Sequence, residues 1–369
     1  MRILIAPDKF KGTLTAAEAA AAMAEGALRV YPEATVTTLP VADGGEGTLE
    51  AAVAAGFEEK LNAVVGPILK PVGAAWALKG TTAAIETAQA SGYLLSEPTP
   101  ENAFRAHSYG CGQLIAAALD AGATELIIGL GGSAMSDAGT GALRALGLQL
   151  LDAHGNLVPL GGGSLVEVAA VDASGLDPRL GRVRIRMAVD VDNPLYGRNG
   201  AAHVFAQQKG ADEDAVELLD AGLRNLASVL RSATGVDINV RGAGAAGGFP
   251  AAFLAYTEAT IERGFDLIAE LTGLYAALEV TDLVITGEGS LDAQSLSGKA
   301  PIGVADAAHA RGLPVVVVAG RIAVSAADLA AHGVVAAASA TEVARSAEEA
   351  QRDAARYVAL ATVEALNGI

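Results

Sequence analysis

The residues best suited to chemistry lie in a glycine-rich loop that follows a short apolar segment late in the chain. Residues 282–286 read DLVIT, a β-branched apolar run typical of a strand buried on both faces. The run leads into Gly-Glu-Gly at residues 287–289 and then to Asp292 and Lys299. Glycines let backbone N–H groups approach a ligand closely, while the carboxylates and the ammonium supply charge. This combination indicates a polyanionic ligand together with a metal ion.

Three further loops repeat this mixture of glycines and acids. Residues 43–47 read DGGEG, residues 131–137 read GGSAMSD, and residues 190–193 read DVDN. Successive glycine amides beside a hydroxyl form an anion-binding nest; the alternative is a tight turn whose Ser or Asp caps the next helix. We favour the nest for residues 131–133, because turns seldom need so many glycines in a row.

A predicted strand ends with two acids, Asp190 and Asp192. Side chains two residues apart in a strand project from the same face. Paired carboxylates in this position suit Mg²⁺, or a general base that accepts a hydroxyl proton. An Asx turn into Pro194 would explain Asn193, but it would not explain two acids on one face.

The first predicted strand is followed by a charged turn, residues 8–12, which read DKFKG. Lys9 and Lys11 beside Asp8 can hold a small carboxylate or a phosphate, and a plain surface turn explains them equally well.

Two other glycine motifs match nucleotide-binding signatures poorly. Residues 242–247 read GAGAAG, but the preceding strand is weak, so a close-packed helix entry or an interdomain loop is favoured over a dinucleotide site. Residues 297–300 read SGKA, as at the end of a P-loop, but Ala293 and Ala300 replace the required Gly and Ser/Thr. A lysine after a glycine near a helix N-terminus can still hold a phosphate.

Composition excludes several functional classes. The chain has 369 residues, 51% of them hydrophobic, and a formal net charge of −17, which argues against a nucleic-acid or anionic membrane surface. A single cysteine excludes an intrachain disulfide and a Cys-based zinc site. No serine lies in a G-x-S-x-G elbow, which weakens acyl transfer. The N-terminus lacks signal-peptide features and no apolar run is of membrane-spanning length, so we expect a cytoplasmic protein.

In so acidic a chain, an anion must be bound by local lysines, backbone amides or a metal. The lysines placed for this role are Lys9, Lys11, Lys209 and Lys299.

These loops must be positioned by the strands and helices around them. At both ends of the chain, predicted strands alternate with predicted helices, which predicts a parallel sheet. The middle reads as a mixed α/β region with a meander. We therefore expect a discontinuous domain of residues 1–60 plus 265–369, an inserted domain of residues 61–264, and an active site in the cleft between them. Expected helices are 15–30 (capped by Thr15 and Glu18), 48–55, 102–121, 142–146, 213–232, 250–262, 303–311, 326–331 and 346–366; expected strands are 2–6, 35–39, 60–66, 72–79, 83–87, 125–130, 184–191, 283–286, 314–319 and 334–338, with a hairpin over 148–159.

Taken together, the loops resemble those of the type I glycerate kinase family. The matching segments run in family order along nearly the whole chain: IAPDKFKGTLTAAEAA, LPVADGGEGT, IIGLGGSAMSDAGTGALRALG, DVDNPLYGRNGAAHVFAQQKGA, GAGAAGGFPAAFLA and DLVITGEGSLDAQSLSGKAPIGVA. The resemblance implies a flavodoxin-like parallel-sheet α/β domain made from both chain ends and interrupted by a second mixed α/β domain. It also implies phosphorylation of D-glycerate with ATP and Mg²⁺, at the 2-hydroxyl to give 2-phosphoglycerate.

The resemblance also implies roles for the residues in the matching motifs. Phosphoryl transfer depends chiefly on positioning and on charge neutralisation. The candidate catalytic residues are Asp190 as general base, Lys9 and Lys299; the substrate-binding candidates are Asp8, Lys11, Asp43, Glu46, Asp192 and Asn193; the nucleotide-binding candidates are Gly131, Gly132, Ser133, Gly287 and Gly289; the Mg²⁺ candidates are Glu288 and Asp292.

Other functions compete with this one. A D-glycerate 3-kinase would phosphorylate the other hydroxyl, a non-catalytic sugar-acid sensor would bind ligand without turnover, and a nucleotide-dependent oxidoreductase would rest on GAGAAG alone. The kinase leads because it alone uses the lysines, the acids and the glycine nests together. The expected partners are D-glycerate and ATP, and the oligomeric state is open between a monomer and a homodimer.

Overall fold

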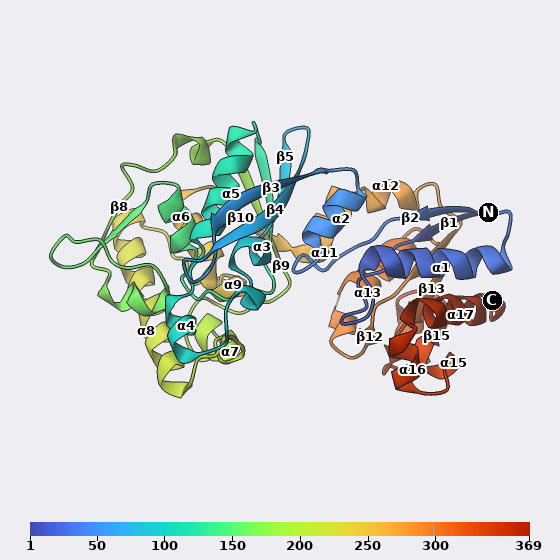
Figure 1. The fold of residues 1–369 in the computed structure, drawn as a ribbon. Helices are drawn as coiled ribbons and strands as arrows, with labels where there is room; N and C mark the ends of the chain where they lie inside the picture. Colours follow the sequence, from blue (N-terminus) through green and yellow to red (C-terminus); the bar gives the residue numbers. More distant parts are fainter. Residues whose placement is uncertain (298) are drawn as a thin grey trace. The chain divides into compact units, whose positions relative to one another are not determined.

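The computed structural model describes residues 1–297 and 299–369, so Gly298 of the predicted 297–300 loop lies outside the described residues. The chain divides into two compact units, which are described separately below (Figure 1). Unit 1 comprises residues 1–43, 50–56 and 265–369, and unit 2 comprises residues 44–49 and 57–264.

Unit 1 is built on a five-stranded parallel sheet to which both ends of the chain contribute. Its spatial order is β15-β13-β11-β1-β2, and neighbouring strands pair in parallel, for example Ile3 with Leu283. Numbered along the chain, this is the 2-1-3-4-5 order of flavodoxin-like sheets. The strands are β1 (Arg2–Ile5), β2 (Thr35–Thr38), β11 (Leu283–Thr286), β13 (Val315–Ala319) and β15 (Val334–Ser339).

Helices cover both faces of this sheet. Alternate side chains of β1 divide between two apolar cores: Ile3 and Ile5 pack in one with residues of α1 and α17, and Leu4 packs in the other with residues of α13. Figure 1 draws α1 (blue) beside α17 (red), and Gly26 lies so close to α17 that an added Cβ would be 2.4 Å from the Ala359 carbonyl oxygen. The helices are α1 (Ala16–Val30), α2 (Thr48–Ala54), which crosses the boundary between the units, α11 (Gly264–Thr272), α12 (Leu274–Leu278), α13 (Ala300–His309), α14 (Ala326–Ala331), α15 (Ala340–Val343), α16 (Ala347–Arg352) and α17 (Ala354–Asn367).

Unit 2 contains a six-stranded mixed sheet in the order β10-β9-β6-β5-β4-β3. The four strands β10, β9, β6 and β5 are parallel, and β4 and β3 form an antiparallel edge. The strands are β3 (Glu58–Val65), β4 (Pro71–Lys79), β5 (Thr82–Glu86), β6 (Glu125–Gly129), β9 (Arg184–Val189) and β10 (Thr260–Arg263). The α/β class, with a parallel sheet from both chain ends and a separate mixed sheet between them, is therefore confirmed.

One large apolar core joins this sheet to the helices of unit 2. The longest of them, α8, buries a stripe of leucines at positions 219, 223, 226 and 230, the spacing of one helix face. The helices are α3 (Thr87–Ser91), α4 (Pro100–Arg105), α5 (Tyr109–Asp120), α6 (Thr140–Ala145), α7 (Ala201–Phe205), α8 (Glu213–Thr234), α9 (Ala245–Gly248) and α10 (Pro250–Tyr256). Two small sheets complete the chain, formed by β7 (Gln149–Leu151) with β8 (Ala170–Asp172) and by β12 (Ser290–Leu291) with β14 (Arg321–Ile322).

Four predicted elements are wrong in part. The helix expected over 102–121 is two helices, α4 and α5, because the Ser108 N–H and hydroxyl both donate to the Asp137 carboxylate (2.8 Å each) and hold the chain between the helices. The helix expected over 250–262 ends at Tyr256, since residues 260–263 pair with β9. The C-terminal helix is likewise divided at Asp353. The hairpin over 148–159 is reduced to a bridge between Leu151 and Leu157, because β7 pairs with β8 instead.

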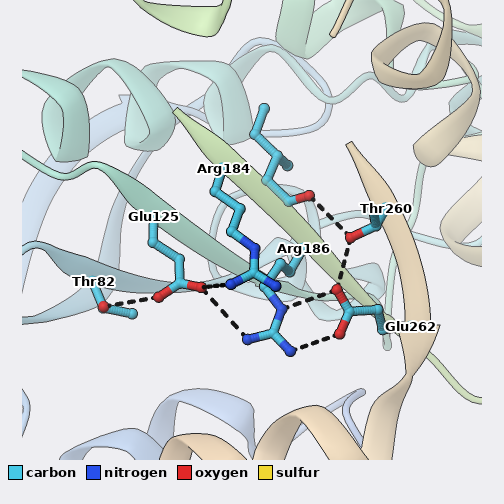
Figure 2. A network of polar contacts seen from close by, with 7 residues as sticks. Thr82, Glu125, Arg184, Arg186, Thr260 and Glu262 are labelled. Carbon is cyan, nitrogen blue, oxygen red and sulfur yellow. Dashed lines mark hydrogen bonds and ion pairs between the residues drawn. The ribbon is translucent and has the colours of Figure 1, made fainter. Parts of the chain in front are cut away.

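A polar network crosses one face of the unit 2 sheet (Figure 2). At its centre lies Arg186, whose side chain is 6% exposed and which donates to both carboxylate oxygens of Glu262, at 2.9 and 2.7 Å. Glu125 lies 3.5 Å from Arg186 and 3.4 Å from Arg184, and it also accepts a hydrogen bond from Thr82. The network thus ties the four parallel strands together through their side chains.

Among the described residues, no helix is both long and apolar enough to cross a membrane.

Candidate active site

In unit 1 the charged turn after β1 packs directly on the Gly-Glu-Gly loop after β11. The Asp8 N–H donates to the Gly287 carbonyl oxygen at 2.9 Å. A Cβ added to Gly289 would lie 3.1 Å from the backbone nitrogen of Lys11, and one added to Gly287 would lie 1.6 Å from the Val318 carbonyl oxygen. Gly287 is therefore required by close backbone packing, and a side chain at Gly289 would need a small shift of the turn after β1; this packing brings the predicted residues of the two loops together.

This junction concentrates carboxylates. Asp8 is 8% exposed, and burial, followed by the nearby charge of Asp43, raises its pKa to about 7. Lys9 opposes that rise through its positive charge and its backbone N–H, which donates to Asp8 Oδ1 at 2.7 Å. Glu288 also adds a repulsive charge to Asp8. The charges of Asp43 and Glu288 therefore both disfavour the ionised form of the Asp8 carboxyl.

Glu288 faces the loop that follows β12. Burial raises the pKa of Glu288, and the charges of Asp292 and Asp43 add to the rise, while Ser295 and Lys299 oppose it. Its Oε1 is buried and has no hydrogen-bond partner among the described residues. The Asp292 carboxylate accepts the Gln294 N–H at 2.8 Å. Lys299 is the residue immediately before α13, where a helix N-terminus favours anions.

In unit 2 the two predicted loops after β6 and around residue 45 also pack together. A Cβ on Gly131 would lie 2.6 Å from the Glu46 nitrogen, and the Leu130 N–H donates to the Gly44 carbonyl oxygen at 3.1 Å. Gly132 has a positive φ of 60°, and its carbonyl oxygen accepts the Tyr93 N–H at 2.8 Å. Gly131 is therefore glycine because another loop occupies the space of its side chain.

Lys209, one of the four lysines predicted from the sequence to bind an anion but not assigned to the site, reaches into the same loop. Its Nζ donates to the Met135 carbonyl oxygen at 2.5 Å and to the Ser133 hydroxyl at 3.4 Å. The residue is 7% exposed, and burial lowers its pKa to about 8, partly offset by the charge of Asp137. The scarcity of lysine in this acidic chain is the sequence signal that marks Lys209.

Asp137 anchors the loop from within. Its carboxylate is fully buried and accepts hydrogen bonds from the Ser108 N–H and hydroxyl, the Gly139 N–H and the Gly141 N–H. Asp137 thus acts as a structural anchor of the turn. For this residue the structure agrees with the alternative interpretation, in which the motif forms a tight turn before the next helix.

The two predicted acids, Asp190 and Asp192, lie in the segment that follows β9. The strand ends at Val189, so Asp190 and Asp192 follow it, and both are exposed. Asp192 forms a two-pronged ion pair with Arg241, at 2.5 and 2.6 Å. Asn193 donates from its side chain to the Asn199 carbonyl oxygen at 2.8 Å. Asp192 is therefore occupied by an arginine that sequence reasoning did not identify.

The GAGAAG segment packs against these loops through its glycines. A Cβ on Gly244 would lie 2.3 Å from the Pro194 carbonyl oxygen, and one on Gly247 would lie 2.0 Å from the Met135 carbonyl oxygen. This close packing agrees with the expected helix entry and explains the glycines without a dinucleotide.

The predicted residues thus fall into two groups. In unit 1, an acidic centre with adjacent lysines contains Asp8, Lys9, Lys11, Asp43, Gly287, Glu288, Gly289, Asp292 and Lys299; in unit 2, loops at strand ends contain Glu46, Gly131, Gly132, Ser133, Asp190, Asp192 and Asn193. The first group offers carboxylates and ammonium groups, and the second offers backbone amides, a hydroxyl and an acid. Each group thus contains residue types that phosphoryl transfer uses.

Comparison with known proteins agrees with this chemistry. The model of the glycerate kinase family matches residues 3–367. A glycerate kinase of Bacillus subtilis is 44% identical over 97% of this chain and 95% of its own length, and a glycerate 2-kinase of Escherichia coli is 44% identical over 90% and 89%. A crystal structure of a Salmonella typhimurium LT2 protein assigned as glycerate kinase 2 superposes with a TM-score of 0.86, at 40% identity, over 99% of this chain and 96% of that one. This chain is an enzyme of the glycerate kinase family.

Proposed function

We propose that the protein transfers the γ-phosphoryl group of ATP to the 2-hydroxyl of D-glycerate and releases 2-phosphoglycerate. The observation that carries the proposal is the similarity of nearly the whole chain to glycerate kinases, which include a relative named glycerate 2-kinase. The lysines and carboxylates around Asp8 and the glycine loop at residues 131–133 supply the charged and donor groups for such a reaction.

The proposed roles follow from the position of each group. Asp190, exposed at the carboxyl end of β9, accepts the proton of the glycerate hydroxyl as it attacks the γ-phosphorus. Lys9 or Lys11 binds the glycerate carboxylate, and Lys299 with the loop at residues 131–133 holds the phosphates. The remaining substrate contacts are assigned to Asp8, Asp43, Glu46, Asp192 and Asn193.

The donor set around Glu288 fits Mg²⁺. Its buried Oε1 has no hydrogen-bond partner among the described residues, and burial, together with the charges of Asp292 and Asp43, raises its pKa, so a cation beside it would stabilise the ionised carboxylate. No group of three or more metal-ligating side chains occurs in the described part of the chain. This suits Mg²⁺, which is bound by one or two carboxylates plus substrate phosphates. Glu288 and Asp292 would hold the ion, which when bound neutralises phosphate charge.

The direct test is incubation of the purified protein with ATP, Mg²⁺ and D-glycerate, followed by phosphorus NMR against both phosphoglycerate isomers. A 2-phosphoglycerate signal is expected. A 3-phosphoglycerate signal would instead establish the 3-kinase, and tight glycerate binding without any product would favour the sugar-acid sensor. The 3-kinase has less support, because the relative whose name specifies a position is a 2-kinase.

The cellular setting is part of the proposal. A kinase that consumes ATP and a small organic acid is expected in the cytoplasm. The domain boundaries, a shared active site and the choice between a monomer and a homodimer stay predictions.

A further inference from the structure

Unit 2 contains a cavity of about 700 Å³ beside the glycine loop. It is lined by the segment after α3, which includes Tyr93 and Leu94, by Ala134 of the loop, by Lys209, and by Lys70 from the turn between β3 and β4. This volume lies within the range of cavities that bind cofactors or drug-sized ligands. A three-carbon acid would fill only a small part of it.

The cavity lies at the end of the sheet where ligands bind in α/β folds. Strands β5 and β6 are parallel neighbours, and the segments that line the cavity follow their carboxyl ends. Strand β9 is the next parallel neighbour, with Gly129 opposite Ala188. The loop that begins at Leu130 and the acid Asp190 therefore leave the same edge of one sheet.

The cavity has a cationic part. Lys209 is almost fully buried there, and its hydrogen bonds to Met135 and Ser133 place its ammonium against the glycine loop. Lys70 is exposed, and its ammonium forms no ion pair among the described residues. One ammonium beside the loop amides and a second that lines the same cavity suit a polyphosphate.

The other part of the cavity is apolar and aromatic. Leu94 is 82% exposed and Tyr93 is 41% exposed, although both side chains are large and hydrophobic. The Tyr93 ring would lie 3.5 Å from a Cβ on Gly132, so the aromatic side chain borders the glycine loop. Exposed apolar groups that line a cavity indicate a planar, apolar ligand surface. The lining also contains Glu97, whose carboxylate can accept hydrogen bonds from ribose hydroxyls.

We infer that this cavity binds the adenosine nucleotide: the base lies against Tyr93 and Leu94, and the phosphates extend along residues 131–133 toward Lys209. The inference rests on the proposed kinase function, and it assigns the nucleotide to unit 2.

The test exchanges the most exposed lining residue for an acid. Leu94→Glu replaces an apolar contact of the base with a charged side chain that must lose water when the base binds, so the KM for ATP and the Kd for a fluorescent ATP analogue should rise about tenfold or more. The KM for D-glycerate should stay unchanged. Leu61→Glu is the matched control, because Leu61 is 74% exposed on β3 and does not line the cavity. Thermal melting of both variants checks that they fold.

The outcomes separate this inference from the function on which it rests. Turnover by the wild type, with ATP affinity lost in Leu94→Glu but kept in Leu61→Glu, supports both. If all three proteins turn over glycerate with the same ATP affinity, the nucleotide does not bind in this cavity, and the proposed kinase activity is kept. If the wild type binds nucleotide but never phosphorylates glycerate, and Leu94→Glu loses the binding, the cavity is the nucleotide site and the proposed kinase activity is wrong. No nucleotide binding by the wild type overturns both.

Discussion

The backbone N–H of Asp8 donates a hydrogen bond to the carbonyl oxygen of Gly287 at 2.9 Å, which joins loops from opposite ends of the chain. The contact places the Asp8 carboxylate among other acids, where burial and the charge of Asp43 raise its pKa to about 7. A charged Asp8 at neutral pH therefore opposes folding, a cost often found where function requires charge.

The exchange Asp8→Asn should raise stability at pH 8 and leave it nearly unchanged at low pH. In the wild type the native state holds a proton on Asp8 that the unfolded chain has released, so stability falls as pH rises from about 4 toward 7. Each pKa unit corresponds to about 1.4 kcal/mol, so the gain is several kcal/mol at most. Asn keeps the oxygen that accepts the Lys9 N–H. Urea unfolding at both pH values measures the effect.

The control for Asp8→Asn is Glu33→Gln, the same kind of exchange at an exposed position of unit 1. It should not change the pH dependence. Equal stability of Asp8→Asn and wild type at pH 8 would show that Asp8 is not held at a raised pKa. Turnover of glycerate should fall sharply in Asp8→Asn, since the site loses one of its charges.

Local signals predicted the elements that depend on local contacts. Thr15 and Glu18 form the expected capping box, in which each side chain binds the other residue's backbone N–H. The break between α4 and α5 was not predictable, because the Asp137 carboxylate that holds Ser108 lies 29 residues along the chain. Such an interruption depends on tertiary structure rather than on residue pattern.

The candidate site could likewise be predicted only where it depends on local sequence. Glycines at 131 and 287 were assigned to ligand binding, and their positions beside functional loops follow from the sequence. Their immediate cause is packing against Glu46 and Val318, which the sequence does not reveal. Likewise, Asp192 was grouped with Asp190 by strand alternation, but its pairing with Arg241 depends on a segment far along the chain.

The proposed base can be tested by Asp190→Asn. Removal of the proton acceptor should lower kcat by about 10² to 10⁴, while the Kd for ATP stays close to that of the wild type. Rapid-quench turnover and calorimetric ATP titration give the two quantities. Asp237→Asn, at an acid that is 60% exposed in the same unit, should leave both unchanged. An unchanged kcat in Asp190→Asn would exclude this residue as the base.

The network in Figure 2 predicts a strong dependence of stability on Arg186. Arg186→Met leaves the Glu262 carboxylate without its arginine at a partly buried sheet face and leaves Glu125 with Arg184 alone, and it should destabilise the protein by roughly 3 kcal/mol at pH 7. Arg184→Met removes an arginine that is 64% exposed, and should cost less than about 1 kcal/mol.

The loss in Arg186→Met should also depend on pH. Hydrogen bonding to Arg186 lowers the pKa of Glu262, so this stability is present above the ordinary Glu pKa and disappears as pH falls through the lowered value. The variant and the wild type should therefore converge in strong acid. Similar losses from both arginine variants would contradict a central role for Arg186.

The KM for ATP should depend on pH through Lys209, which lines the cavity. Its pKa of about 8 means that the ammonium loses its proton as pH rises through 8, because burial penalises the charged form. If Lys209 contacts the ATP phosphates, the KM for ATP should rise above pH 8 while the KM for glycerate does not. Lys209→Arg, which stays charged in this range, should abolish that rise.

The stability of the folded protein should rise with pH over the range in which the affinity for ATP falls. Between pH 8 and the ordinary lysine pKa of 10.5, the unfolded chain holds a proton that native Lys209 has released, so the contribution of Lys209 to stability increases with pH. Lys209→Met removes this dependence and also leaves the Met135 carbonyl without its donor, at a cost of about 1 to 3 kcal/mol. A rise in KM for ATP above pH 8 that persists in Lys209→Arg would assign the titration to another group and leave Lys209 as a structural tie of the loop.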